Sequence, residues 1–179
     1  SRNELIQGRV ARFQEAKIPL AVIDIPEMAQ RNIAALFERD GKGVVLLSFD
    51  QGGGLLTFTH GGELYLSRRI DVTLSQLNDA DEALRRQNFE RVVLELQRSL
   101  DYFDRSYHFI ALGRLLLGPL PDSIALAAYL APNLSLPVEA LNLSRALDFT
   151  ATPELNETEN QARYFQVLGA ALRQEGKAL

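Results

Sequence analysis

The chain has 179 residues, a formal net charge of −4 and 46% hydrophobic residues, which suits one domain or two small, closely packed lobes. Positive and negative residues are mixed along the chain, so the sequence lacks the basic face that a nucleic-acid-binding protein needs. The absence of cysteine excludes disulfides, thiolate metal ligands and a cysteine nucleophile, and no apolar run reaches the roughly 18 residues of a membrane-spanning helix.

The first 40 residues predict a helix, a strand and a second helix. Residues 4–17 favour an amphipathic helix because apolar side chains recur near helical spacing at Leu5, Ile6, Val10 and Phe13. Residues 20–25 form a branched apolar run, which is typical of a buried strand. Pro26 suits the first turn of the second helix, whose apolar stripe is Met28, Ile33, Leu36 and Phe37. Residues 1–8 carry no signal-peptide pattern, and we expect the chain to be an excised fragment.

Residues 44–70 predict an antiparallel meander of three strands. Residues 44–49 are continuously apolar, as expected for a strand in the middle of a sheet. Residues 56–59 alternate apolar and threonine, and Gly61-Gly62 supplies the positive-φ positions of a tight hairpin turn. The return strand carries Leu64, Leu66 and Ile70.

The rest of the chain predicts a long helix and then strand, helix, strand and helix. Residues 83–107 repeat apolar side chains every three or four positions, with two pairs of opposite charge on the solvent side, Arg91–Glu95 and Asp101–Arg105. Strands are expected at residues 109–117 and 137–143, around a helix that Asp122 or Ser123 caps and Leu130 ends. Such a strand–helix–strand unit implies parallel pairing. The closing helix contains Tyr164, Phe165, Leu168, Ala171 and Leu172.

This order of elements defines an α/β fold class. A meander followed by helix, strand, helix, strand and helix is the order of a ribonuclease-H-like half-module, the unit that is doubled in actin-like ATPases. We therefore predict a mixed sheet, with an antiparallel meander on one side and parallel strands on the other, flanked by helices.

Four segments carry a family resemblance. Residues 22–27 with Arg31-Asn32, residues 61–70, residues 95–102 and residues 169–173 occur in an order and spacing that resemble the MshI family of MSHA-type pilus biogenesis proteins, relatives of the pilus assembly protein PilM. The resemblance spans residues 4–173. It implies that residues 1–40 are the last piece of a first actin-like lobe and that residues 41–179 are the second lobe.

The same resemblance implies a place and a set of partners. A member of this family is cytoplasmic and lies at the inner face of the inner membrane. It reaches the membrane only through partners, which are PilN-like and MshJ-type pilus assembly proteins. An exposed edge of the meander is a surface to which such a partner can add a strand.

The first expected nucleotide loop departs from the family pattern. Actin-like ATPases have an Asp-x-Gly turn after the first strand of this lobe, and an ungapped alignment places Ser48 at the Asp position and Asp50 at the Gly position. Serine is a poor magnesium ligand, and a carboxylate at the second position repels phosphate. A shifted register restores Asp50-Gln51-Gly52 as Asp-x-Gly. The segment Gly52-Gly53-Gly54 is then either a plain glycine-rich turn or a remaining nucleotide contact.

The second expected loop also departs from the pattern. The adenosine turn of the family is rich in glycine, whereas this chain has Gly118-Pro119-Leu120-Pro121. Proline has no N–H to donate, and leucine adds bulk where a base or a ribose packs. Asp50, Gly52, Gly53, Gly54 and Gly118 are therefore candidates only for a degenerate nucleotide site, and we expect no ATP hydrolysis, no cofactor and no metal.

Other chemistry has little support in the sequence. His60 and His108 are far apart and lack spaced carboxylates, so surface or capping roles are expected. No Gly-x-Ser-x-Gly elbow is present. The sequence favours a non-catalytic interaction domain in pilus assembly. Two alternatives remain open: an actin-like ATPase completed by a missing lobe, and the related cytoplasmic scaffold of type II secretion.

Overall fold

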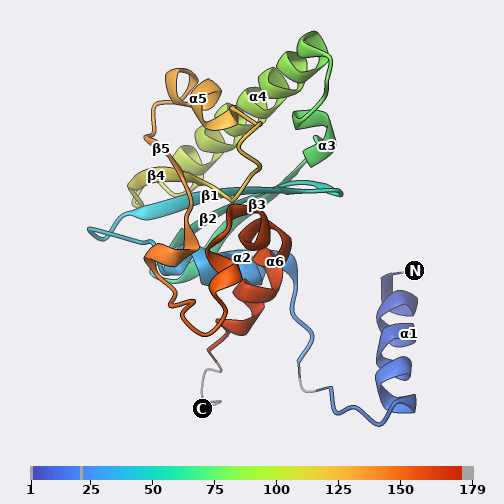
Figure 1. Ribbon diagram of the computed structural model, residues 1–179. Helices are drawn as coiled ribbons and strands as arrows, with labels where there is room; N and C mark the ends of the chain where they lie inside the picture. The colour runs from blue at the N-terminus through green and yellow to red at the C-terminus, as the bar shows by residue number, and fades with distance from the viewer. Residues whose placement is uncertain (1, 21, 175–179) are drawn as a thin grey trace.

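Five strands form one mixed sheet in the order β3-β2-β1-β4-β5 (Figure 1). The computed structural model describes residues 2–20 and 22–174, without the side chains of residues 2, 3 and 5. The predicted mixed sheet is confirmed, because the first three strands form an antiparallel meander and the last two run parallel to the first. The strands are β1 (Gly43–Asp50), β2 (Gly53–His60), β3 (Glu63–Ile70), β4 (Leu112–Leu117) and β5 (Val138–Ala140).

The central strand β1 is continuously apolar over residues 44–47, where both of its faces are buried. Val45 and Leu47 point into one core, and Val44 and Leu46 point into the core on the opposite face. The hairpin turn after β2 has positive φ angles at Gly61 (59°) and Gly62 (76°), as the sequence predicts.

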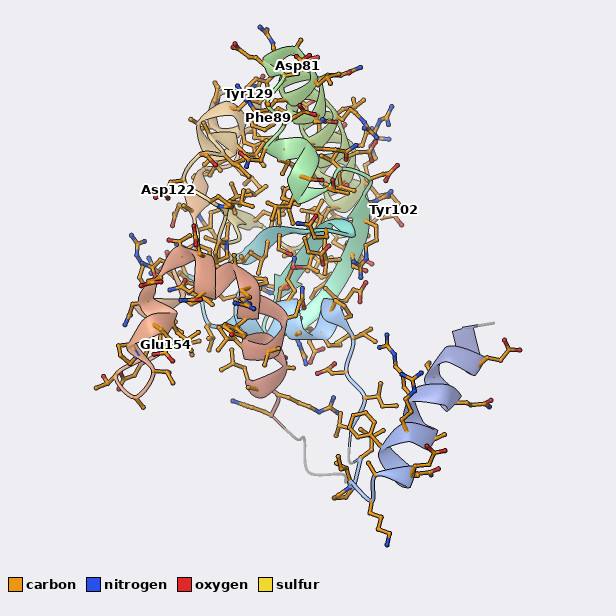
Figure 2. The ribbon with its side chains drawn as sticks, turned by 45° about the vertical axis from the view of Figure 1, so that its right-hand side comes forward. Asp81, Phe89, Tyr102, Asp122, Tyr129 and Glu154 are labelled. Carbon is orange, nitrogen blue, oxygen red and sulfur yellow. The ribbon has the colours of Figure 1, made fainter. Side chains whose placement is uncertain are left out.

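Helices cover both faces of the sheet (Figure 1). The long helix α4 lies on one face with two short helices, and two helices pack together on the other face. The first layer contains α3 (Leu74–Leu77), α4 (Glu82–Ser106) and α5 (Leu126–Leu130), and the second contains α2 (Pro26–Ala35) and α6 (Thr158–Ala171). Figure 2 shows the rings of Phe89 and Tyr129 meeting where α4 packs on α5, with centroids 5.3 Å apart.

The second layer is held by close approach of its two helices. A Cβ added at Gly169 of α6 would lie 2.3 Å from the carbonyl oxygen of Ala29 in α2, so only glycine fits this crossing. The side chain of Asn32 donates a hydrogen bond of 2.9 Å to the carbonyl of Gly169. A one-turn 3₁₀ helix follows α5 at Ala131–Asn133. Two more lie between β5 and α6, at Leu143–Arg145 and Pro153–Asn156.

The predicted first helix is confirmed, and the strand predicted after it is wrong. Helix α1 (Arg2–Glu15) stands apart from the sheet in Figure 1. Residue 20 and residues 22–25 have no regular structure, and Leu20, Val22, Ile23 and Ile25 are between 37% and 56% exposed. A branched apolar run becomes a strand only when a neighbouring strand pairs with it, and the two edges of the sheet are β3 and β5. Ala21 lies outside the described residues, and the division of the chain at residue 40 stays a prediction.

Two smaller expectations are corrected. Neither Asp122 nor Ser123 caps α5, which begins at Leu126 after Ala125 without a side-chain cap. On α4 the ion pairs differ from those expected, because Arg91 reaches Asp71 at 3.9 Å and Arg98 reaches Glu95 at 2.9 Å.

Candidate functional site

The two candidate turns lie at the same edge of the sheet. Strands β1 and β4 are parallel neighbours, so the turn after Asp50 and the turn at Gly118 both follow carboxyl ends of strands. In open α/β sheets this edge is where ligands bind. The structure therefore brings together the two segments that the sequence singles out.

In the first turn, a side-chain carboxylate and a backbone N–H form a hydrogen bond with each other. Oδ1 of Asp50 accepts a hydrogen bond of 2.7 Å from the backbone N–H of Gly52, which closes an Asx turn. Gly53 has a φ of 126°, and a Cβ there would lie 2.8 Å from the carbonyl oxygen of Ile70. A Cβ at Gly54 would lie 2.7 Å from the ring of Phe49. The hairpin itself therefore explains why both residues are glycine: Gly53 because of its backbone conformation, and Gly54 because of close packing.

Ser48, the residue aligned with the metal-binding Asp of the family, points into a buried polar cluster. Its Oγ donates a hydrogen bond of 2.6 Å to Oε1 of Gln30, which is fully buried in α2. Nε2 of Gln30 donates in turn to the carbonyls of Leu46 and Leu55 at 2.7 and 3.0 Å, and to Oγ1 of Thr57 at 3.0 Å. The Ser48 hydroxyl is therefore part of the packing between α2 and the sheet.

Sequence reasoning missed Gln30, although the sequence contains a signal for it. Gln30 lies three and seven positions before Ile33 and Phe37, so it falls on the apolar stripe of α2. The stripe itself was placed wrongly in part, because Leu36 is 42% exposed and Ala29 is buried instead. A polar residue on an apolar helix face predicts a satisfied buried hydrogen-bonding group.

The second turn has few free donors. The N–H of Gly118 donates a hydrogen bond of 2.7 Å to the carbonyl of Leu47, which ties β4 to β1. A Cβ at this position would lie 3.1 Å from the Cβ of Ser48. Pro119 and Pro121 have no N–H, and the carbonyl of Pro121 accepts from Ile124 at 2.9 Å. The turn does not lead directly into a helix, since α5 starts only at Leu126.

A pocket of about 380 Å³ opens beside this second turn. One wall is apolar, and the other carries polar side chains from the β5–α6 region. The most buried of these is Gln161, whose Oε1 accepts a hydrogen bond of 2.9 Å from the N–H of Leu143 and whose Nε2 donates 3.1 Å to Oγ of Ser144. Asp50 does not line the pocket. The lining includes Leu120, Ile124, Ala127, Asn142, Arg145, Thr158 and Gln161.

The described part of the chain contains neither a metal-binding cluster nor a membrane-spanning helix. No cluster of three or more histidine, aspartate or glutamate side chains within residues 2–20 and 22–174 is arranged to hold a metal ion. None of the helices in those ranges combines the length and apolar character that crossing a bilayer demands. The clearest electrostatic perturbation lies elsewhere, at Asp148, where hydrogen bonds from the Thr150 hydroxyl and N–H lower the pKa of the carboxyl below its usual 3.8.

The sheet order and the helices on both faces define an actin-like half of the kind found in PilM. A chain of the solved structure described as "PilM-PilN type IV pilus biogenesis complex" matches this one with a TM-score of 0.73 and 18% sequence identity. The match covers 96% of this chain and 58% of that chain. At this identity the likeness shows a shared PilM-like fold. No protein-family model matches the sequence, and no curated protein matches it either.

Proposed function

We propose that this protein is a non-catalytic scaffold of type IV pilus biogenesis. It works at the cytoplasmic face of the inner membrane and binds a PilN-like membrane-anchored protein. The observation that carries the proposal is the PilM-like fold, in a chain where Ser48, Oδ1 of Asp50 and the N–H of Gly118 each have a hydrogen-bond partner within the protein. The solved relative is a complex of PilM with PilN, so a PilN-like tail is the first partner to test.

The state of the two turns supports a scaffold over an ATPase. An actin-like cleft needs backbone N–H donors for phosphate and a carboxylate for the metal. Here the Gly118 N–H donates a hydrogen bond to the carbonyl of Leu47, and the Ser48 hydroxyl donates to Gln30. The Asp50 carboxylate accepts a hydrogen bond within its own turn. A ligand that used these same groups would have to replace their hydrogen bonds, and each is worth about 0.5–1.5 kcal/mol to the fold.

Nucleotide titration tests the non-catalytic part of the proposal. Calorimetry of the full-length protein with ATP, with and without magnesium, is expected to show no saturable binding. The rival proposal of an actin-like ATPase draws on the open pocket of about 380 Å³ beside Gly118. Saturable, magnesium-dependent binding that is lost in Asp50→Asn, and kept in the control Asp104→Asn at an exposed carboxylate of α4 outside that pocket, would refute the scaffold proposal.

Partner capture tests the pilus part of the proposal. The sequence segments that resemble MshI support an MSHA-type system, so MshJ-type and PilN-like cytoplasmic tails are expected to be retained by the immobilised protein. Tails from the equivalent type II secretion proteins serve as the comparison. Retention of the secretion tails alone would move the protein to that machinery.

A further inference from the structure

A small hollow with basic side chains lies at the amino ends of the parallel strands. It has a volume of about 210 Å³ and is bounded by the first residues of β1 and β4, the start of β5 and the turn that joins α2 to β1. The turns at Asp50 and Gly118 lie at the other end of the same strands. Three basic and two acidic side chains line the hollow, which gives it a formal charge of +1 in a chain of net charge −4. They are Arg39, Asp40, Lys42, Arg114 and Glu139.

The turn between α2 and β1 places two of the cations side by side. Arg39 and Lys42 face each other in an antiparallel bridge, and the N–H of Lys42 donates a hydrogen bond of 3.0 Å to the carbonyl of Arg39. Asp40 and Gly41, between them, have positive φ angles of 54° and 65°, as in two-residue hairpin turns. Residues directly opposite in an antiparallel pair point to the same face, with Cβ atoms about 4.5–5.5 Å apart. In Figure 1 this turn is the blue loop that projects past the end of the sheet between α2 and β1.

No carboxylate in the described part of the chain neutralises these two facing cations. Like charges directly opposite each other in an antiparallel pair are destabilising. Both side chains are exposed, and within residues 2–20 and 22–174 neither has a hydrogen bond or an ion pair. On β4, a Cβ added at Gly113 would lie 3.2 Å from the Cβ of Lys42, so the glycine leaves room for Lys42 beside the strand. A bound anion would remove the repulsion between the two cations.

The third cation, Arg114, is nearly buried and held in place. Its side chain is only 11% exposed, and its Nη1 forms an ion pair of 3.2 Å with Glu139. Its Nη2 donates a hydrogen bond to the carbonyl of Phe37. Its Nε has no hydrogen-bond partner in the part of the chain that the structure describes. A guanidinium carries five N–H donors in a fixed fork that matches the oxygens of an oxyanion, so a fixed Arg114 is preorganised to bind one.

We propose that this hollow binds a phosphate group between Arg39, Lys42 and Arg114. Phosphate offers several strong acceptor oxygens, which arginine binds with its fork and lysine binds as a point charge. The volume is below the roughly 300–1,000 Å³ of sites for drug-sized ligands, so the hollow suits a phosphate group rather than a whole nucleotide. Of the two acids, Glu139 is already paired with Arg114, and Asp40 opposes the anion and limits its affinity. The site does not depend on the proposed scaffold function.

Isothermal titration calorimetry of the full chain with inorganic phosphate tests the site, at an ionic strength held constant with sodium chloride. Glycerol 3-phosphate is the second probe, and acetate is the control anion. The variant Arg39→Gln/Lys42→Gln removes both exposed cations of the hollow. Arg9→Gln/Arg12→Gln, which removes two exposed cations from α1, is the control with the same loss of charge. Asp40→Asn removes the opposing carboxylate and keeps a residue type that tolerates positive φ.

We expect saturable phosphate binding that is at least tenfold weaker in Arg39→Gln/Lys42→Gln, unchanged in the α1 control and tighter in Asp40→Asn. Phosphate should also raise the Tm of the wild type more than that of Arg39→Gln/Lys42→Gln, because a ligand that binds only the folded state stabilises it. Acetate should bind at least tenfold more weakly than phosphate.

Vesicles that contain phosphatidic acid distinguish the two sources of a phosphate group. Co-sedimentation that depends on Arg39 and Lys42, with weaker binding of glycerol 3-phosphate, would support the site and assign it to a lipid headgroup. Tight binding of glycerol 3-phosphate without co-sedimentation would support the site and assign it to a soluble phosphate. No saturable binding of any phosphate probe, equal binding by the wild type and Arg39→Gln/Lys42→Gln, or acetate binding as tight as phosphate would each overturn the proposal. The scaffold function would stand in all these cases, since partner capture tests it separately.

Discussion

Replacing Gly169 by alanine tests the packing of α2 against α6. The new Cβ would lie 2.3 Å from the carbonyl oxygen of Ala29 and 2.7 Å from its carbonyl carbon. Both atoms are backbone, so neither can move aside without shifting a helix. The shift would also stretch the hydrogen bond from Asn32 to the Gly169 carbonyl.

The expected cost follows from three opposing effects. Overpacking in a rigid core costs about 1–3 kcal/mol, and a lengthened hydrogen bond costs about 1 kcal/mol. Alanine recovers about 1 kcal/mol through its higher helix propensity. The free energy of unfolding should therefore fall by about 1–3 kcal/mol, which for a chain of this size lowers Tm by roughly 2–12 °C.

Thermal and urea unfolding followed by circular dichroism measure this change. The matched control is Gly8→Ala in α1, where a Cβ meets nothing within 4 Å. That variant should be as stable as the wild type or slightly more stable. A Gly169→Ala protein that unfolds at or above the wild-type temperature would refute the tight crossing of α2 and α6.

Three further predictions concern other parts of the fold. Gln30→Leu removes the side chain to which Ser48 and Thr57 are hydrogen-bonded, so urea unfolding should show that the free energy of unfolding falls by about 1–3 kcal/mol. Adding Ser48→Ala to the same chain should partly restore that stability. Gly53→Ala forces a side chain to a φ of 126° and to 2.8 Å from the Ile70 carbonyl, and its Tm should fall while that of Gly61→Ala, in open space at a φ of 59°, falls less. The Asp148 pKa is lowered in the folded state, so its contribution to stability is present above pH 3.8 and is lost as the pH falls through the folded pKa; an NMR titration should place its midpoint below 3.8, and Thr150→Val should raise that midpoint.

The sheet was predictable because its signals are local. Continuous apolar residues in β1, alternation in β2 and the Gly61-Gly62 turn each specify one element, and the long apolar repeat of α4 specifies another. Apart from Asp24, the segment predicted as a strand at residues 20–25 is as apolar in sequence as residues 44–47 of β1. What differs is the presence of a pairing strand, which is a tertiary property that composition does not encode.

The detail of the two candidate turns was not predictable from the sequence. Because β1 and β4 are parallel neighbours, Asp50 and Gly118 lie at one edge of the sheet, and a nucleotide site there stays a prediction. The partner of Ser48 was not foreseen, because Gln30 is 18 residues away along the chain and approaches only once α2 lies on the sheet.

The buried glutamine explains how this edge of the sheet is held from within. Where parallel strands end, backbone and side-chain polar groups near the edge need partners, and in a nucleotide-binding protein the ligand supplies some of them. In this chain Gln30 bonds to Ser48 and to strand carbonyls of β1 and β2, while the Gly118 N–H joins β4 to β1. Because these bonds lie in the protein itself, the PilM-like sheet needs no ligand to satisfy them.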